Sequence, residues 1–167
     1  MGIIAYYFVG VAPLKKWTAS LVLLPISLYY LLTRGNYTLI DNADLVIHEA
    51  GHFFFIFFGN FIYALGGTLM QIIFPLFLAF YFWQNDYRTG FQIMIAWLGQ
   101  NWINISVYVA DAQVRQLRLL GNGKHDWFYL LGELGIREYC VEIGWIFMGF
   151  STITFLIALS IPLFYEQ

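Results

Sequence analysis

The sequence predicts an all-α, polytopic membrane protein with four or five transmembrane helices. Two observations support this fold class. Of the 167 residues, 60% are hydrophobic and only 11% are charged, whereas soluble domains are about 45–50% apolar and about 25% charged. The apolar residues also form continuous runs instead of the alternating pattern of a transmembrane β-barrel. We therefore expect residues 1–167 to form one integral membrane domain in contact with lipid.

Five apolar segments are candidates to cross a hydrocarbon core of about 30 Å as helices. Gly66 and Gly67, followed by Pro75 within the third segment, interrupt what would otherwise be one long apolar tract. Because glycine and proline weaken a helix, we expect either a tight turn there or an extended, re-entrant segment. The expected spans are residues 17–32, 45–65, 68–83, 91–110 and 141–164.

Charge and cysteine content exclude several classes of protein. The net charge is −2 and no basic stripe is present to hold phosphates, so nucleic acid is not an expected partner. The single cysteine, Cys140, excludes a disulfide scaffold and a cysteine-based zinc ribbon. The expected partners are membrane lipid and a membrane-protein or peptide substrate.

The motif His-Glu-Ala-Gly-His stands at residues 48–52, inside the second expected span. On a helix, His48 and His52 lie about one turn apart on the same side, so both imidazoles can bind one Zn²⁺ ion. Glu49 lies about 100° away around the helix axis, a suitable position for a general base acting on a zinc-activated water. Ionisable side chains in a membrane helix are costly and usually mark function. The motif therefore predicts a catalytic zinc site.

A zinc hydrolase of this type needs a third protein ligand. The candidates, in order of preference, are His125, Asp111 and Asp126. Asp126 has an alternative role, because an aspartate directly before Trp127 is typical of the N-cap of a short helix. The sequence leaves the third position open among these three residues.

A polar stripe runs along the fourth expected span. Gln100, Asn104 and Asp111 lie within about 40° of one another around the helix axis, so this side must face the protein interior or a water-filled cavity. Gln100 and Asn104 are candidates to hydrogen-bond the substrate or the oxyanion. The alternative for both is hydrogen bonding between helices.

The zinc motif inside a hydrophobic helix resembles the site-2 protease-like intramembrane zinc metalloproteases. The resemblance implies that His48 and His52 are the paired ligands and that Glu49 is the catalytic glutamate. The counterpart of the family's later aspartate ligand is Asp111, although the surrounding Leu-Asp-Gly pattern is absent. The chain is also similar to a group of small uncharacterised bacterial membrane proteins that combine HEAGH with His-Asp-Trp, here at residues 125–127. This similarity implies a location in the bacterial inner (cytoplasmic) membrane.

The expected function is therefore a membrane-embedded zinc metalloprotease that cleaves peptide bonds in or near the bilayer. One alternative is a zinc-binding pseudo-protease or membrane chaperone without turnover. A purely structural subunit and a di-metal oxidase are further alternatives, although three histidines are few for the latter. These alternatives differ in whether the protein binds zinc and whether it cleaves peptides.

The expected spans conflict with the expected metal site. If all five segments cross the membrane, the HEAGH motif lies near the entry end of the second span, and Asp111 and His125 emerge on the opposite face. Zinc–ligand distances near 2.1 Å do not allow such a separation. Either residues 68–83 re-enter without crossing, or residues 112–126 fold back into the bundle.

Overall fold

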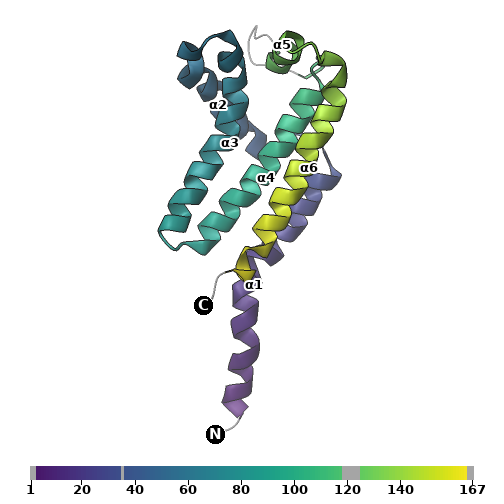
Figure 1. Cartoon of the computed structure of the whole chain (residues 1–167). Coiled ribbons are helices and arrows are strands. Elements are labelled where there is room, and N and C mark those ends of the chain that lie inside the picture. Colours follow the sequence, from purple (N-terminus) through teal and green to yellow (C-terminus); the bar gives the residue numbers. More distant parts are fainter. Residues whose placement is uncertain (1–2, 35, 118–124, 165–167) are drawn as a thin grey trace.

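The computed structural model describes residues 3–34, 36–117 and 125–164, with only the backbone described for residues 3–14. Within these ranges the chain is helical and contains no strand, which confirms the all-α prediction. Long helices pack side by side, and two short ones lie near one end of the bundle (Figure 1). The helices are α1 (Ile3–Leu32), α2 (Leu39–Phe55), α3 (Asn60–Gln84), α4 (Arg88–Ala110), α5 (Asp126–Glu133) and α6 (Cys140–Ser160), with short 3₁₀ helices η1 (Ile56–Phe58), η2 (Arg137–Tyr139) and η3 (Ile161–Leu163).

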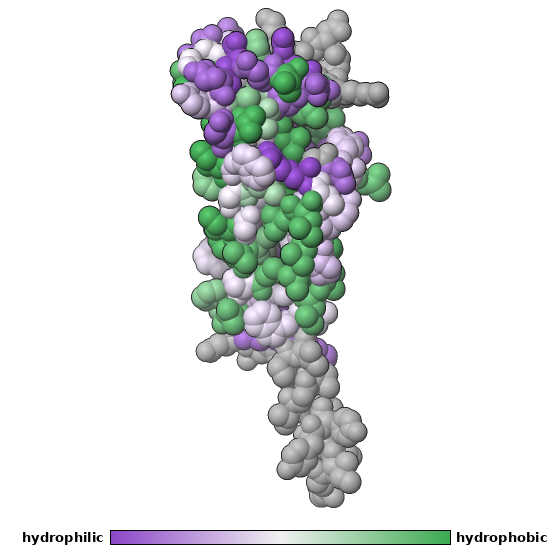
Figure 2. All heavy atoms as spheres, turned by 90° about the vertical axis from the view of Figure 1, so that its right-hand side faces the viewer, coloured by the Kyte–Doolittle hydropathy of each residue, from purple (hydrophilic) through white to green (hydrophobic). Residues whose placement is uncertain are grey.

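Among the described residues, two helical segments are long and apolar enough to cross a membrane. One is α3 and the other is the continuous run Arg137–Leu163 that contains α6. On the face drawn in Figure 2, hydrophobic residues cover the middle of the molecule, and hydrophilic residues gather at the end near α5. This distribution matches the surface expected of a helix bundle in a bilayer.

Helix α4 lies between α3 and α6 (Figure 1), and several of its polar side chains are fully buried. The amide nitrogen of Gln92 donates to the hydroxyl of Ser20 on α1 at 2.7 Å. About two turns further along the same face of α4, Ser151 of α6 donates to the carbonyl of Gly99 at 2.6 Å. Polar contacts of this kind hold helices together where lipid surrounds them. They also explain why α4, although long, is less apolar than α3.

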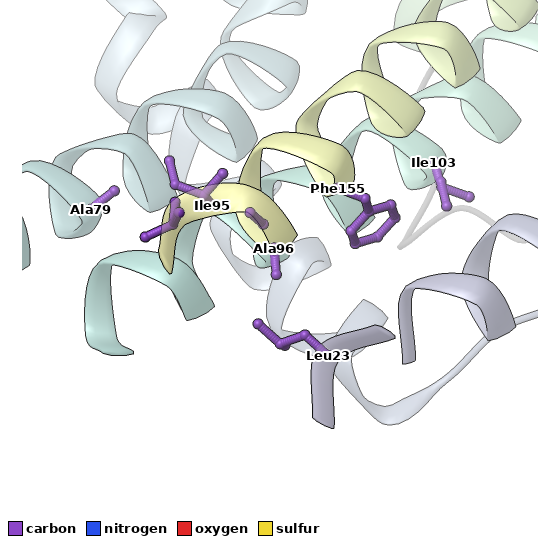
Figure 3. Close-up of a cluster of buried hydrophobic side chains, with 8 residues drawn as sticks. Leu23, Ala79, Ile95, Ala96, Ile103 and Phe155 are labelled. Carbon is purple, nitrogen blue, oxygen red and sulfur yellow. The ribbon is translucent and has the colours of Figure 1, made fainter. Parts of the chain in front are cut away.

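An apolar cluster joins the four long helices at the level of the middle of α4 (Figure 3). It is built around side chains that are at most 9% exposed, so it excludes water from the centre of the bundle. Its members are Leu23 of α1, Ala79 of α3, Ile95, Ala96 and Ile103 of α4, and Phe155, Ala158 and Ile161 at the end of α6 and in η3.

The second expected span is not one helix. Helix α2 ends at Phe55, and the chain turns through η1 and Gly59, whose φ of +83° favours glycine. Helix α3 then begins at Asn60 and continues without a break through Pro75. The interruption predicted between residues 66 and 75, either a turn or a re-entrant segment, is therefore wrong. The break comes several residues earlier.

The glycines of α3 serve helix packing rather than a turn. A Cβ atom on Gly51 of α2 would collide with the backbone oxygen of Gly66, and a Cβ atom on Gly67 would collide with the imidazole of His48. Small residues at both positions let α2 and α3 approach closely. The α2–α3 hairpin thus carries the zinc motif at the same end of the bundle as α5 (Figure 1).

Candidate metal centre

Two histidines of α2 converge on one carboxylate oxygen of α5. Nε2 of His48 lies 3.0 Å from Oδ2 of Asp126, and Nε2 of His52 lies 3.3 Å from the same oxygen. One potential ligand atom from each of the three residues lies within 4.8 Å of the others. His48, His52 and Asp126 therefore form a group that can hold a metal ion.

The other ring nitrogen of each histidine is held by an acceptor. Nδ1 of His48 lies 3.0 Å from the side-chain oxygen of Gln71, and Nδ1 of His52 lies 2.8 Å from the backbone carbonyl of Tyr63. A carbonyl oxygen can only accept, so each Nδ1 carries the proton and each neutral Nε2 presents a lone pair. Metal-binding histidines in proteins are typically fixed in this way.

These lone pairs make a cation a good fit for the centre. Two neutral Nε2 atoms and a carboxylate oxygen would repel one another without a positive charge between them. Four ligands at about 2.1 Å in a tetrahedron around zinc are separated by about 3.4 Å. The distances of 3.0 and 3.3 Å from Nε2 to Asp126 Oδ2 are close to that edge length. The donor set of two imidazoles and one carboxylate is also typical of catalytic zinc.

The pKa shifts of Asp126 and His52 also favour a negative carboxylate beside positive charge. Burial opposes ionisation of Asp126, but hydrogen bonds from His48 and His52 outweigh it and lower the pKa of its carboxyl group to about 2. The same hydrogen bond to Asp126 raises the pKa of His52, against the opposing effect of burial. The centre is therefore built to combine a negative carboxylate with positive charge.

The sequence placed His125 and Asp111 ahead of Asp126 as third ligand, but the structure pairs these two residues with each other. Nε2 of His125 lies 3.4 Å from Oδ2 of Asp111, and both side chains are buried. Asp111 also accepts the backbone N–H groups of Gln116 and Leu117. Of the three candidates, Asp126 is the one brought against His48 and His52.

The expected N-cap role of Asp126 is wrong. Helix α5 begins at Asp126 itself, and its N-cap is His125, whose Nδ1 accepts the backbone N–H of Phe128 at 3.2 Å. The carboxylate of Asp126 is not available for capping, because it faces the histidine pair and also accepts the hydroxyl of Tyr108 at 3.1 Å. Tyr108 in turn accepts the backbone N–H of Asp126 at 3.0 Å, which fixes the start of α5 over the centre.

A cavity of about 900 Å³ opens beside the metal centre. Glu49 is exposed and lines this cavity together with His48, His52 and Asp126. The cavity is therefore large enough for several amino-acid residues, and it brings a carboxylate next to the metal-binding group. Its other walls include Tyr30, Leu45, Tyr63, Ile103, Val107 and Tyr108.

Asn104 and Gln100 also line the cavity, but their amide groups bond to the protein. The amide nitrogens of both donate to Oδ1 of Asp41, at 3.0 and 3.1 Å. Oδ1 of Asn104 accepts the amide of Gln71 at 2.9 Å. Both therefore take the interhelical hydrogen-bonding role that the sequence left open, and whether either also contacts a substrate stays a prediction.

Sequence reasoning missed four residues that support the centre: Asp41, Tyr63, Gln71 and Tyr108. A signal existed for Gln71, because a single polar side chain in an apolar span usually faces the protein interior. Tyr63 acts through its backbone carbonyl, so no pattern of residue types identifies it. Asp41 resembles an ordinary acidic residue in the first turn of a helix.

No protein-family model matches the chain, and no curated protein or solved structure is significantly similar to it. Function therefore rests on the geometry and chemistry of this centre.

Proposed function

We propose that the protein is an integral membrane zinc metalloprotease that hydrolyses peptide bonds in or near the bilayer. The observation that carries the proposal is the convergence of two Nε2 lone pairs on Asp126, beside Glu49, in a cavity of about 900 Å³. The chain's resemblance to site-2 protease-like enzymes in residues 48–52 supports the same reaction.

In this proposal His48, His52 and Asp126 hold the zinc ion. Zinc would lower the pKa of a bound water and polarise the scissile carbonyl. Glu49 accepts a proton from the attacking water and returns it to the leaving amine, so that acid and base work are done by one carboxylate. The wall of Tyr30, Leu45, Ile103 and Val107 offers apolar contact for a substrate from the membrane.

The proposed membrane arrangement has four crossings, by α1, α3, α4 and α6. Large apolar side chains are exposed on all four of these helices, and they include Leu21 of α1, Phe77 of α3, Ile93 of α4 and Leu156 of α6. Helices α2 and α5 close one end of the bundle (Figure 1). The similarity to small bacterial membrane proteins favours the inner (cytoplasmic) membrane as the location.

The test is to purify the protein in detergent, measure its zinc content, and reconstitute it with a mixture of bacterial membrane proteins. New peptide N-termini are then identified by mass spectrometry. Glu49→Gln is expected to keep about one zinc per chain and to lose at least about 100-fold of the cleavage rate. Glu138→Gln, at an exposed glutamate outside the cavity, is the matched control.

Two outcomes would contradict the proposal. Zinc bound without any cleavage by the wild type would favour the zinc-binding pseudo-protease or membrane chaperone. Cleavage by Glu49→Gln at the wild-type rate would exclude Glu49 as the base.

A further inference from the structure

A continuous chain of hydrogen bonds runs from the start of α2 to the metal centre through three helices. Asn104 of α4 donates to Oδ1 of Asp41 at 3.0 Å. Gln71 of α3 donates to Oδ1 of Asn104 at 2.9 Å, and its own oxygen lies 3.0 Å from Nδ1 of His48. Asp41 and Gln71 are at most 7% exposed, so water competes little with these bonds.

The direction of this chain is set at Asp41. Its carboxylate faces donors alone: the backbone N–H and hydroxyl of Thr38, each at 2.6 Å, and the amides of Gln100 and Asn104. An ionised carboxylate can only accept. Asn104 must therefore turn its NH₂ group towards Asp41 and its oxygen towards Gln71, and Gln71 must then turn its own oxygen towards His48.

We propose that Asp41 is a positioning residue that sets the tautomer of His48 through Asn104 and Gln71. The chain forces the proton of the neutral imidazole onto Nδ1 and leaves Nε2 free to bind the metal. Asp41 acts at a distance, because it does not itself contact the centre. The inference rests on the proposed function only in taking Nε2 of His48 as a metal ligand.

This chain of hydrogen bonds predicts a specific outcome for the substitution Asp41→Asn. The new amide keeps its oxygen towards Thr38 and turns its NH₂ group towards α4. The NH₂ groups of Gln100 and Asn104 on α4 already face this position, so donor would meet donor. Asn104 and Gln71 then reverse, and Gln71 donates to Nδ1 of His48. The proton of His48 moves to Nε2, the atom that should bind the metal.

The primary measurement is ¹⁵N NMR of histidine-labelled, zinc-free protein at a pH where the imidazoles are neutral, with His48→Ala used for assignment. In the wild type, Nδ1 of His48 is expected to carry the proton. In Asp41→Asn, Nε2 is expected to show the ¹⁵N chemical shift of a protonated nitrogen, and Nδ1 that of an unprotonated nitrogen. Zinc affinity, measured by competition with a chelator, is expected to fall about 10–100-fold, as for other outer-shell partners of metal ligands.

Two further variants separate positioning from folding. Asp44→Asn removes a fully buried carboxylate from the same helix. Asp44 accepts from Trp97 and interacts with Gln100, a second donor to Asp41, but it lies outside the hydrogen bonds that link Asp41 to His48 through Asn104 and Gln71. Asp44→Asn is expected to leave both tautomer and zinc affinity unchanged. The double variant Asp41→Asn/Gln71→Glu is expected to restore both, because the carboxylate introduced on α3 can accept from His48 and from a reversed Asn104 at once.

An unchanged His48 tautomer in Asp41→Asn would overturn the proposal. So would a double variant whose zinc affinity stays as low as that of the single variant. The tautomer is measured without metal or substrate. If the proton pattern follows the prediction while the wild type binds no zinc, the proposed function fails and the positioning role of Asp41 stands.

Discussion

Two histidine–aspartate groups lie side by side at one end of this bundle, and they differ in where the protons are. In the first, His48 and His52 each donate from Nδ1 to a carbonyl oxygen, so both Nε2 atoms turn lone pairs towards Asp126. In the second, Nδ1 of His125 accepts the N–H of Phe128. Its neutral ring must then carry the proton on Nε2, which faces Asp111.

The comparison shows that residue type and distance alone do not identify a metal ligand. Both groups combine imidazole with carboxylate at 3.0–3.4 Å. The hydrogen bond at Nδ1 decides whether Nε2 of each neutral imidazole presents a lone pair, as in the first group, or a proton, as in the second. The first group can hold a metal ion, and the second caps the start of α5 through Nδ1 of His125.

The largest effect is expected at Asp126, the carboxylate of the first group. Asp126→Ala should lose zinc almost completely, with affinity falling by more than the ~100-fold typical of outer-shell changes, because one of three protein ligands is removed. His48→Ala and His52→Ala should behave alike. Elemental analysis of purified protein measures this directly. If Asp126→Ala still contains about one zinc per chain, another residue must be the third ligand.

The sequence was sufficient for the helical class and for pairing His48 with His52, because four-residue spacing and ionisable groups in an apolar run have strong physical meaning. The catalytic role of Glu49 stays a prediction. The sequence was insufficient for the third ligand. His125, Asp111 and Asp126 are all chemically suitable, and the choice depends on the path of the chain after α4. Residues 118–124 of that path lie outside the described structure.

The division between α2 and α3 was equally hard to predict. Gly66, Gly67 and Pro75 are the expected helix breakers, yet all three lie inside α3. At Gly66 and Gly67, close packing against α2 requires small residues. The actual turn uses Gly59 after a run of phenylalanines that reads as continuous helix. Folding α2 back onto α3 also brings residues 48–52 to the same end of the bundle as α5 (Figure 1).

Asp44 carries a third buried carboxylate at this end of the bundle, and it differs from Asp126 and Asp111 in having no histidine partner. Burial is the main cause that raises the pKa of Asp44 from 3.8 to about 6, against hydrogen bonds from Trp97 and neighbouring amides. The folded protein thus keeps a proton that the unfolded chain loses above about pH 4. Stability should fall as pH rises from about 4 to about 6, and stay lower above that range.

Asp44→Asn should remove this pH-dependent loss. Its free energy of unfolding should exceed that of the wild type by at most about 3 kcal/mol at pH 8, since one pKa unit is worth about 1.4 kcal/mol. The advantage should disappear near pH 4. Thermal unfolding in detergent at both pH values measures it, and an equal difference at pH 4 and pH 8 would contradict the role of Asp44 ionisation.

A steric change at α3 should disturb the first group and leave the second intact. A Cβ atom on Gly67 would collide with the imidazole of His48, so Gly67→Ala should displace the ring and cost about 1–3 kcal/mol of stability, together with part of the zinc affinity. Gly149→Ala is the matched control, since a Cβ atom added to this glycine of α6 would meet no other atom within 4 Å. Equal zinc affinity in both variants would show that His48 has room to move.

The smallest effect is expected in the second group. His125→Ala removes the N-cap of α5 and should cost about 1 kcal/mol of stability, because the N–H of Phe128 loses its acceptor. His125→Asn keeps an acceptor at this position and should recover most of that loss. Both variants should still bind about one zinc per chain, since Tyr108 continues to hold Asp126 through two hydrogen bonds. If His125→Asn loses zinc as completely as Asp126→Ala, then His125 itself is a ligand, and the division between the two groups is wrong.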